Sequence, residues 1–145
     1  MKHRSAFLVL WVSALMLWSC SEGKRGKSFT VEVPCALTWS RTGVVLTPGQ
    51  RITLVAEGEL RGGEWRFGPE GTNDHPQWTR YSLVPEWPHL ALIAKVGEDG
   101  DPFLVGRRFS GTVIRGGELY LGINDLDAEN NDGSFEVTVT VEENR

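Results

Sequence analysis

The chain has 145 residues, 40% of them hydrophobic and 23% charged, with a formal net charge of −4. This length suits one domain with a buried core. The sequence shows neither a basic stripe nor a nucleic-acid-binding motif, which argues against a nucleic-acid partner.

Residues 1–19 have the pattern of a secretory signal peptide. A basic start precedes the apolar run 6–18, which is too short to span a bilayer as a stable helix. The closing Leu17-Trp18-Ser19-Cys20 resembles a bacterial lipobox, so we expect Cys20 to be lipidated. Ordinary signal cleavage near Ser19 or Cys20 is the alternative.

Residues 20–28 are polar and contain Gly, so they are expected to form a flexible linker before a domain at 29–145. Without residues 1–19, the chain keeps 13 of its 15 basic residues and all 19 acidic ones. Ser directly after the lipidated Cys implies, by resemblance to bacterial lipoproteins, an exported protein anchored in the outer membrane. Acylation of Cys20 would leave Cys35 without an intrachain partner, and we expect Cys35 to be buried.

From residue 29 onward the sequence predicts an almost entirely β structure. The predicted strands are 29–33, 43–46, 51–56, 90–96, 103–105, 118–123 and 134–142. Apolar residues alternate with polar ones from Phe135 to Glu142, which is typical of a strand with one face in a core. The run 90–96 is the most continuously apolar and is predicted to be a central strand.

The 17 Gly and 7 Pro residues punctuate the chain at intervals that suit short antiparallel strands, and no segment has a helical period. We therefore predict an all-β protein with a jelly-roll-like antiparallel β-sandwich of about eight strands. The longest region without a strand signal is 57–87. Its aromatic residues argue against disorder, and a loop of this length usually carries function; they are Trp65, Phe67, Trp78, Tyr81 and Trp87.

The loop from Asp125 to Gly133 is rich in oxygen donors. Its carboxylates and amides belong to Asp125, Asp127, Glu129, Asn130, Asn131 and Asp132. Calcium takes about six to eight oxygen ligands from carboxylates, amides and carbonyls, so the loop is a candidate calcium site. The alternative is a solvated acidic turn, since Asp, Asn and Gly dominate turns.

The domain also carries an ordered set of short motifs. They are Thr47-Pro-Gly-Gln-Arg-Ile-Thr-Leu-Val-Ala-Glu-Gly58, Phe67-Gly-Pro-Glu-Gly71, His75-Pro-Gln77, Ala91-Leu-Ile-Ala-Lys-Val-Gly97, and Asn124-Asp125 with Asn130-Asn131-Asp-Gly-Ser-Phe135. The set resembles the PA-IL (LecA) family of bacterial galactose-binding lectins over about residues 31–141. The resemblance implies a small β-sandwich whose bound Ca2+ itself coordinates sugar hydroxyls.

By this resemblance, Asp125, Asn130 and Asn131 are expected to be calcium ligands. The family's Thr in this loop has no counterpart here, and Asp127 could replace its oxygen. A backbone carbonyl from the region 60–63 is a further expected ligand.

The resemblance also implies sugar-binding residues. His75 and Gln77 are expected to hydrogen-bond the sugar, and Asp125 to accept a hydrogen bond from a sugar hydroxyl. Leu126, next to Asp125 in the chain, belongs to the same predicted carbohydrate-binding set.

Together these features predict calcium-dependent binding of galactose-type carbohydrate by a lipid-anchored protein of the bacterial cell envelope. The alternative is an envelope structural or protein-interaction domain that has the lectin fold and no sugar site. An enzyme is not expected, because the chain has only three His residues and no G-x-S-x-G motif. The sequence leaves the oligomeric state open.

Overall fold

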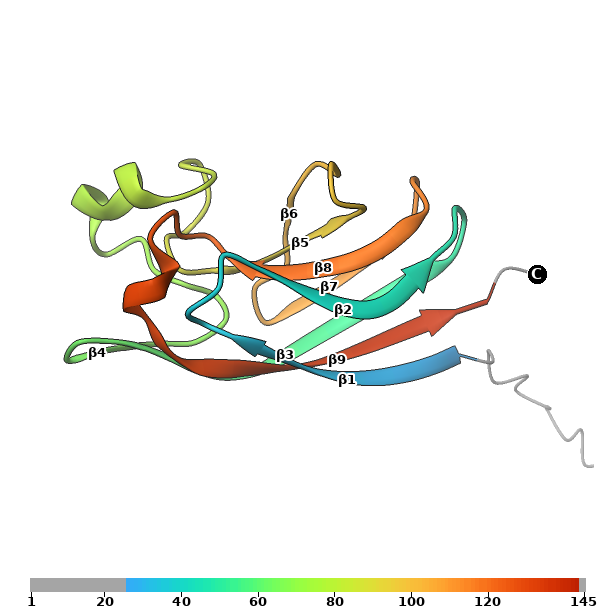
Figure 1. Cartoon of the computed structure of the whole chain (residues 1–145), viewed down its shortest axis with the longest axis horizontal. Coiled ribbons are helices and arrows are strands. Elements are labelled where there is room, and N and C mark those ends of the chain that lie inside the picture. Colours follow the sequence, from blue (N-terminus) through green and yellow to red (C-terminus); the bar gives the residue numbers. More distant parts are fainter. Residues whose placement is uncertain (1–25, 144–145) are drawn as a thin grey trace, which may run out of the picture.

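The computed structural model describes residues 26–143, which form two antiparallel β-sheets (Figure 1). The predicted signal peptide, Cys20 and residues 21–25 of the predicted linker lie outside the described residues. Residues 26–28, also predicted to be linker, instead belong to the first strand, which begins at Gly26. Within 26–143, no helix is long and apolar enough to cross a membrane.

Each sheet combines strands that are distant in the sequence with one pair of consecutive strands. The larger sheet has the order β1 (Gly26–Pro34), β9 (Asp132–Glu142), β3 (Arg51–Gly62) and β4 (Trp65–Phe67), with β7 (Arg108–Thr112) also paired to β3. The smaller sheet has the order β2 (Trp39–Leu46), β8 (Gly117–Ile123), β5 (Leu92–Val96) and β6 (Phe103–Leu104). Two short 3-10 helices are present, η1 (Pro76–Tyr81) and η2 (Ala128–Asn130).

The predicted all-β antiparallel sandwich is confirmed, with nine strands in the described part of the chain. The core lies between the sheets, and β9 contributes Phe135, Val137 and Val139, which are fully buried. Strand β5 pairs with β8 on one side and β6 on the other, as expected of a central strand. Cys35 is also fully buried and is a free thiol, as predicted.

Strand β3 is longer than the sequence pattern predicted. It was expected to end at Ala56, but it continues to Gly62 and pairs with β9 from Arg51 to Arg61. The apolar alternation stops because Glu57, Gly58 and Glu59 are exposed, while the backbone pairing continues. A Cβ on Gly58 would collide with the carbonyl of Ser134, so the close approach of the two strands requires glycine. The extension carries the β3–β4 hairpin to one end of the sandwich (Figure 1).

Candidate functional site

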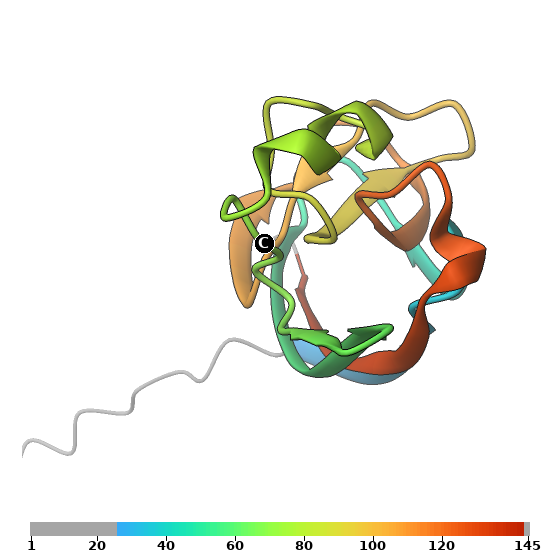
Figure 2. The same cartoon turned by 90° about the vertical axis from the view of Figure 1, so that its left-hand side faces the viewer.

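The acidic loop (125–133) and the segment 65–87, here called the aromatic segment, meet at one end of the sandwich, where β8 ends and β9 begins (Figure 2). Asn124 is fully buried there. Its amide accepts a hydrogen bond from the Val84 N–H at 2.8 Å and donates to the carbonyls of Val84 and Pro88, each at 3.0 Å. The N–H of Leu126 donates to the Tyr81 carbonyl at 2.7 Å. These bonds hold the aromatic segment against the acidic loop.

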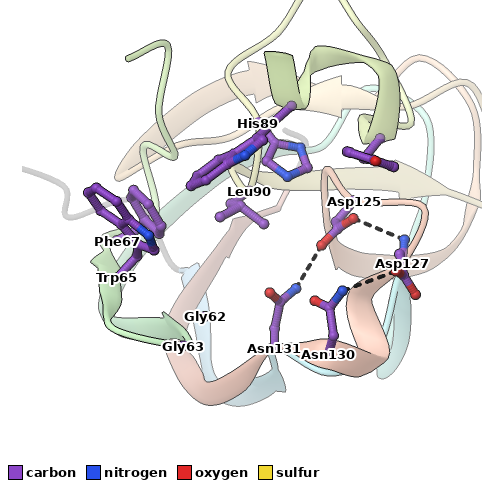
Figure 3. Close-up of a pocket in the computed structure, with 12 residues that line it drawn as sticks. Gly62, Gly63, Trp65, Phe67, His89, Leu90, Asp125, Asp127, Asn130 and Asn131 are labelled. Carbon is purple, nitrogen blue, oxygen red and sulfur yellow. Dashed lines mark hydrogen bonds between the residues drawn. The ribbon is translucent and has the colours of Figure 1, made fainter. Parts of the chain in front are cut away.

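A pocket of about 500 Å3 opens between these segments (Figure 3). One side is aromatic and the other carries carboxylates and amides. The lining residues are Gly62, Gly63, Trp65, Phe67, Trp78, Tyr81, His89, Leu90, Asp125, Asp127, Asn130 and Asn131. We call this cavity the loop pocket.

The four predicted metal ligands all line the loop pocket and bond to one another. Asp125 is 3% exposed; its Oδ1 accepts from the Asp127 N–H at 2.9 Å and its Oδ2 from Asn131 Nδ2 at 2.8 Å. Asn130 Nδ2 donates to Asp127 Oδ2 at 3.0 Å. Among residues 26–143, no Lys or Arg forms an ion pair with Asp125. A buried carboxylate without a cationic partner is costly, so a bound cation would stabilise this arrangement.

The other two acids of the loop do not join this cluster. Glu129 is exposed on η2, and Asp132 pairs with Arg61 at 2.9 Å. Within the described part of the chain, no three His, Cys, Asp or Glu side chains are grouped for metal binding. A cation would therefore depend on two carboxylates together with amide and backbone oxygens, a donor set that fits calcium and not a softer metal.

The β3–β4 hairpin forms the side of the pocket next to Asn131. The position of a Cβ on Gly62 would lie 3.6 Å from Asn131 Oδ1, and Gly63 has φ +60°. The absence of side chains here leaves the backbone of the hairpin facing the amide. This is the region from which a carbonyl ligand was expected.

The three residues predicted to contact only sugar do not line the loop pocket. His75 stacks on Trp78, with ring centroids 3.9 Å apart and 24° between the planes. Gln77 is exposed on η1, and the Leu126 side chain is 59% exposed. The structure therefore brings the predicted metal ligands together at the cavity wall. Of the predicted sugar contacts it places only Asp125 there, and leaves His75, Gln77 and Leu126 outside.

His89 lines the pocket and was not singled out from the sequence. Its Nδ1 lies 3.0 Å from Ser82 Oγ, and both residues are buried. Desolvation lowers the pKa of His89 and outweighs the opposite effects of the Asp125 carboxylate and the Asn124 backbone. Ser82 is 3% exposed and does not line the pocket, so its hydroxyl anchors the imidazole and does not face a ligand.

The backbone beside His89 is strained. Leu90 has φ 66°, a conformation that costs a non-glycine residue about 1 kcal/mol or more. The strand was predicted to begin at this residue, but β5 begins at Leu92. The Leu90 N–H donates to the Asn124 carbonyl, so the strained turn connects His89 to the end of β8.

Comparison with known proteins gives a match among solved structures only. No family model matches the chain, and no curated protein sequence does. Among solved structures, the chain is similar to the N-terminal domain of EclA, a PllA-like lectin, with a TM-score of 0.60 and 25% sequence identity. The match covers 78% of this chain and 95% of that one. The fold of this protein is therefore lectin-like.

Proposed function

We propose that this protein binds galactose-type carbohydrate in the loop pocket and that binding depends on calcium. The observation that carries the proposal is the division of one cavity into an aromatic wall and a carboxylate–amide wall. A hexose has hydroxyl groups on one side and C–H groups on another, so it needs both kinds of surface. The similarity to a lectin domain supports the same function.

Calcium would be held by Asp125, Asp127, Asn130 and Asn131, with a backbone carbonyl from the Gly62–Gly63 turn. When bound, calcium supplies coordination sites for sugar hydroxyls. The residues themselves keep their oxygens close together through three hydrogen bonds, which reduces the ordering cost of forming the site. Calcium binding would also compensate the buried charge of Asp125.

The aromatic side of the pocket would contact the apolar face of the sugar. Trp65 is 52% exposed and Trp78 is half-buried, so their rings offer a surface to a ligand. Trp65 also lies edge-on to Trp78, with centroids 6.1 Å apart. His75 stacks on Trp78, and this contact holds the indole in position.

We further propose that the protein is exported and anchored to the bacterial envelope through a lipid on Cys20. The first strand begins at Gly26, so the anchor would lie close to the domain. Anchored copies concentrated on a surface would raise the avidity for glycans that carry several terminal sugars. Replacing Cys20 with Ser should move the protein from the membrane fraction to the soluble fraction.

The central experiment is a thermal melt with EDTA, with calcium, and with calcium plus galactose. We expect the melting temperature to rise with calcium and again with galactose, since each ligand binds the folded state. Galactose added with EDTA should have no effect. A rise with calcium alone, with no response to any sugar of a panel, would instead support the structural or protein-interaction alternative.

A further inference from the structure

We propose that His89, and not His75, is the histidine that hydrogen-bonds the sugar and sets specificity for one of its hydroxyl groups. This inference rests on the proposed carbohydrate-binding function and adds a residue role to it. It depends on where the two imidazoles lie relative to the loop pocket, on how each is held, and on which polar atoms each has free.

The position of His89 is fixed by its backbone. The His89 N–H donates to the Thr72 carbonyl at 3.0 Å, and the Thr72 N–H donates to the His89 carbonyl at 2.8 Å. On the other side, the strained Leu90 bonds to Asn124 at the end of β8. A side chain held this way loses little conformational freedom when a ligand binds.

The imidazole is also fixed. Ser82 Oγ lies 3.0 Å from Nδ1, so Nε2 is the ring nitrogen that Ser82 leaves for a ligand. The imidazole also interacts with the Asn124 backbone, which helps to fix the ring. Figure 3 shows the His89 ring between the aromatic wall and Asp125. A neutral imidazole offers one donor and one acceptor, and the Ser82 hydroxyl can serve either tautomer. Nε2 can therefore donate to, or accept from, a sugar hydroxyl near the proposed calcium.

His75 has a different environment. Its ring packs among the aromatic side chains, at 3.9 Å from Trp78 and 4.7 Å from Trp65, and it does not line the pocket. No hydrogen bond of its ring to any residue in 26–143 is found. A phenyl ring in its place would keep the stacking on Trp78. The role of His75 is therefore to position Trp78 in the aromatic wall of the loop pocket.

The test is a comparison of matched variants by calorimetric titration with methyl galactoside in calcium. His89→Phe removes the nitrogen and keeps a ring, and Ser82→Ala added to it avoids an unpaired hydroxyl. His75→Phe is the matched control. We expect the His89 variants to lose about ten-fold in sugar affinity and the His75 variant to lose less than about two-fold. The calcium-induced rise in melting temperature should be retained in all of them.

Deoxy sugars identify the sugar hydroxyl that contacts His89. They also give a measurement on the wild-type protein, which does not depend on whether a variant folds. One monodeoxy galactoside should bind the wild-type protein about ten-fold more weakly than methyl galactoside, because it lacks the partner of His89. The affinity for that deoxy sugar should not fall further in His89→Phe, since the hydrogen bond between His89 and the missing hydroxyl is already absent. If His89→Phe does not fold, His89→Gln, which can still bond to Ser82, is tested in the same cycle.

The outcomes separate this inference from the proposed function. If the wild-type protein binds no sugar in calcium, both the proposed function and the role of His89 are overturned. Wild-type binding with unchanged affinity in the His89 variants and a large loss in His75→Phe would overturn the inference alone. The inference would also be overturned if, for every deoxy sugar, the loss of affinity from the missing hydroxyl simply added to the loss from the His89 substitution. No hydroxyl would then depend on His89.

Discussion

The two ends of the sandwich each carry a pocket, and the pockets differ in chemistry. The register of β3 on β9 runs from Arg51 opposite Glu142 to Arg61 opposite Asp132, so Ile52 and Gly62 lie toward opposite ends. The loop pocket is at the Gly62 end. A second pocket of about 400 Å3, here called the strand pocket, is at the Ile52 end.

The strand pocket is mainly apolar. Its lining residues are Ile52, Val96, Gly100, Asp101, Phe103, Phe109, Thr112, Val113, Ile114 and Arg115. Several of these residues belong to the core or pack against it, among them Ile52, Val113 and Phe103. In the loop pocket, by contrast, several loops bring polar side chains to one point. The comparison teaches that convergent polar groups, and not cavity volume, distinguish a candidate binding site.

The largest expected effect is at the centre of the loop pocket. Asp125→Asn keeps the shape of the side chain and removes its charge, so calcium affinity should fall by about a hundred-fold or more, with galactose binding lost as well. Glu129→Gln, which neutralises an exposed acid of the same loop, is the control. Calcium titration calorimetry measures both. Equal calcium affinity of Asp125→Asn and the wild type would show that this end binds no calcium through Asp125.

The next effect concerns how the loops are held together. Asn124→Ala leaves the Val84 N–H and two partly buried carbonyls without their partner, so the free energy of unfolding should fall by about 2–4 kcal/mol. Urea denaturation measures this loss. Thr53→Ala, which removes a hydroxyl contact on the exposed face of β3, should change stability by less than about 0.5 kcal/mol. Equal stability of the two variants would mean that Asn124 does not join the loops.

The aromatic wall is expected to matter for binding more than for folding. Trp65 is 52% exposed, so Trp65→Ala should lower galactose affinity by about two- to ten-fold, with less than about 1 kcal/mol change in stability. Galactose titration and urea denaturation of the same sample separate the two effects. A large stability loss with unchanged sugar affinity would assign Trp65 to packing.

A smaller effect is expected from the buried thiol close to the acidic loop. Burial raises the pKa of Cys35 from 9.0 to about 12. Below pH 9 the thiol is protonated in folded and unfolded chains alike; above it, only the unfolded chain releases the proton, so stability should fall as the pH rises. Denaturation at pH 8 and pH 10 should show a larger decrease for wild type than for Cys35→Ala. An identical decrease in the two proteins would contradict this pKa shift.

The smallest effect is at the strand pocket. Ile114 is 91% exposed at its rim, so Ile114→Ser should change the free energy of unfolding by less than about 0.5 kcal/mol. Calcium and galactose binding should be unchanged. A loss of sugar affinity in this variant would place a ligand at the apolar end and break the contrast between the pockets.

The sequence predicted the strands better where burial alternates. The prediction of 134–142 agrees with β9 because its apolar residues fall on one face. The end of β3 was missed because Gly58 and two exposed acids carry no apolar signal, although backbone pairing continues. The three-residue β4 and the five-residue β7 were missed as well, and all of their residues are exposed or half-buried. Backbone hydrogen bonds hold such strands, and hydrogen bonds leave little pattern in a sequence.

The residues of the candidate site also fall into those that the sequence predicted and those that it missed. The four oxygen-bearing residues of one loop were found together because they are neighbours in the chain, and the structure places all of them at one pocket. His89 carried no signal, because the short apolar context around it does not show which way an imidazole faces. Asn124 was visible only as part of a motif, and its bonds to the aromatic segment span about 40 residues of sequence.

By itself, the sequence determined the all-β class, the alternating core strand β9, the burial of Cys35 and the clustering of oxygen donors between Asp125 and Asn131. These are local properties, set by the side-chain period of a strand and by residues adjacent in the chain. Only the tertiary structure decided that His89 lines the loop pocket while His75 stacks on Trp78. That choice depends on hydrogen bonds between distant segments, which exist only after the two sheets and their loops have packed.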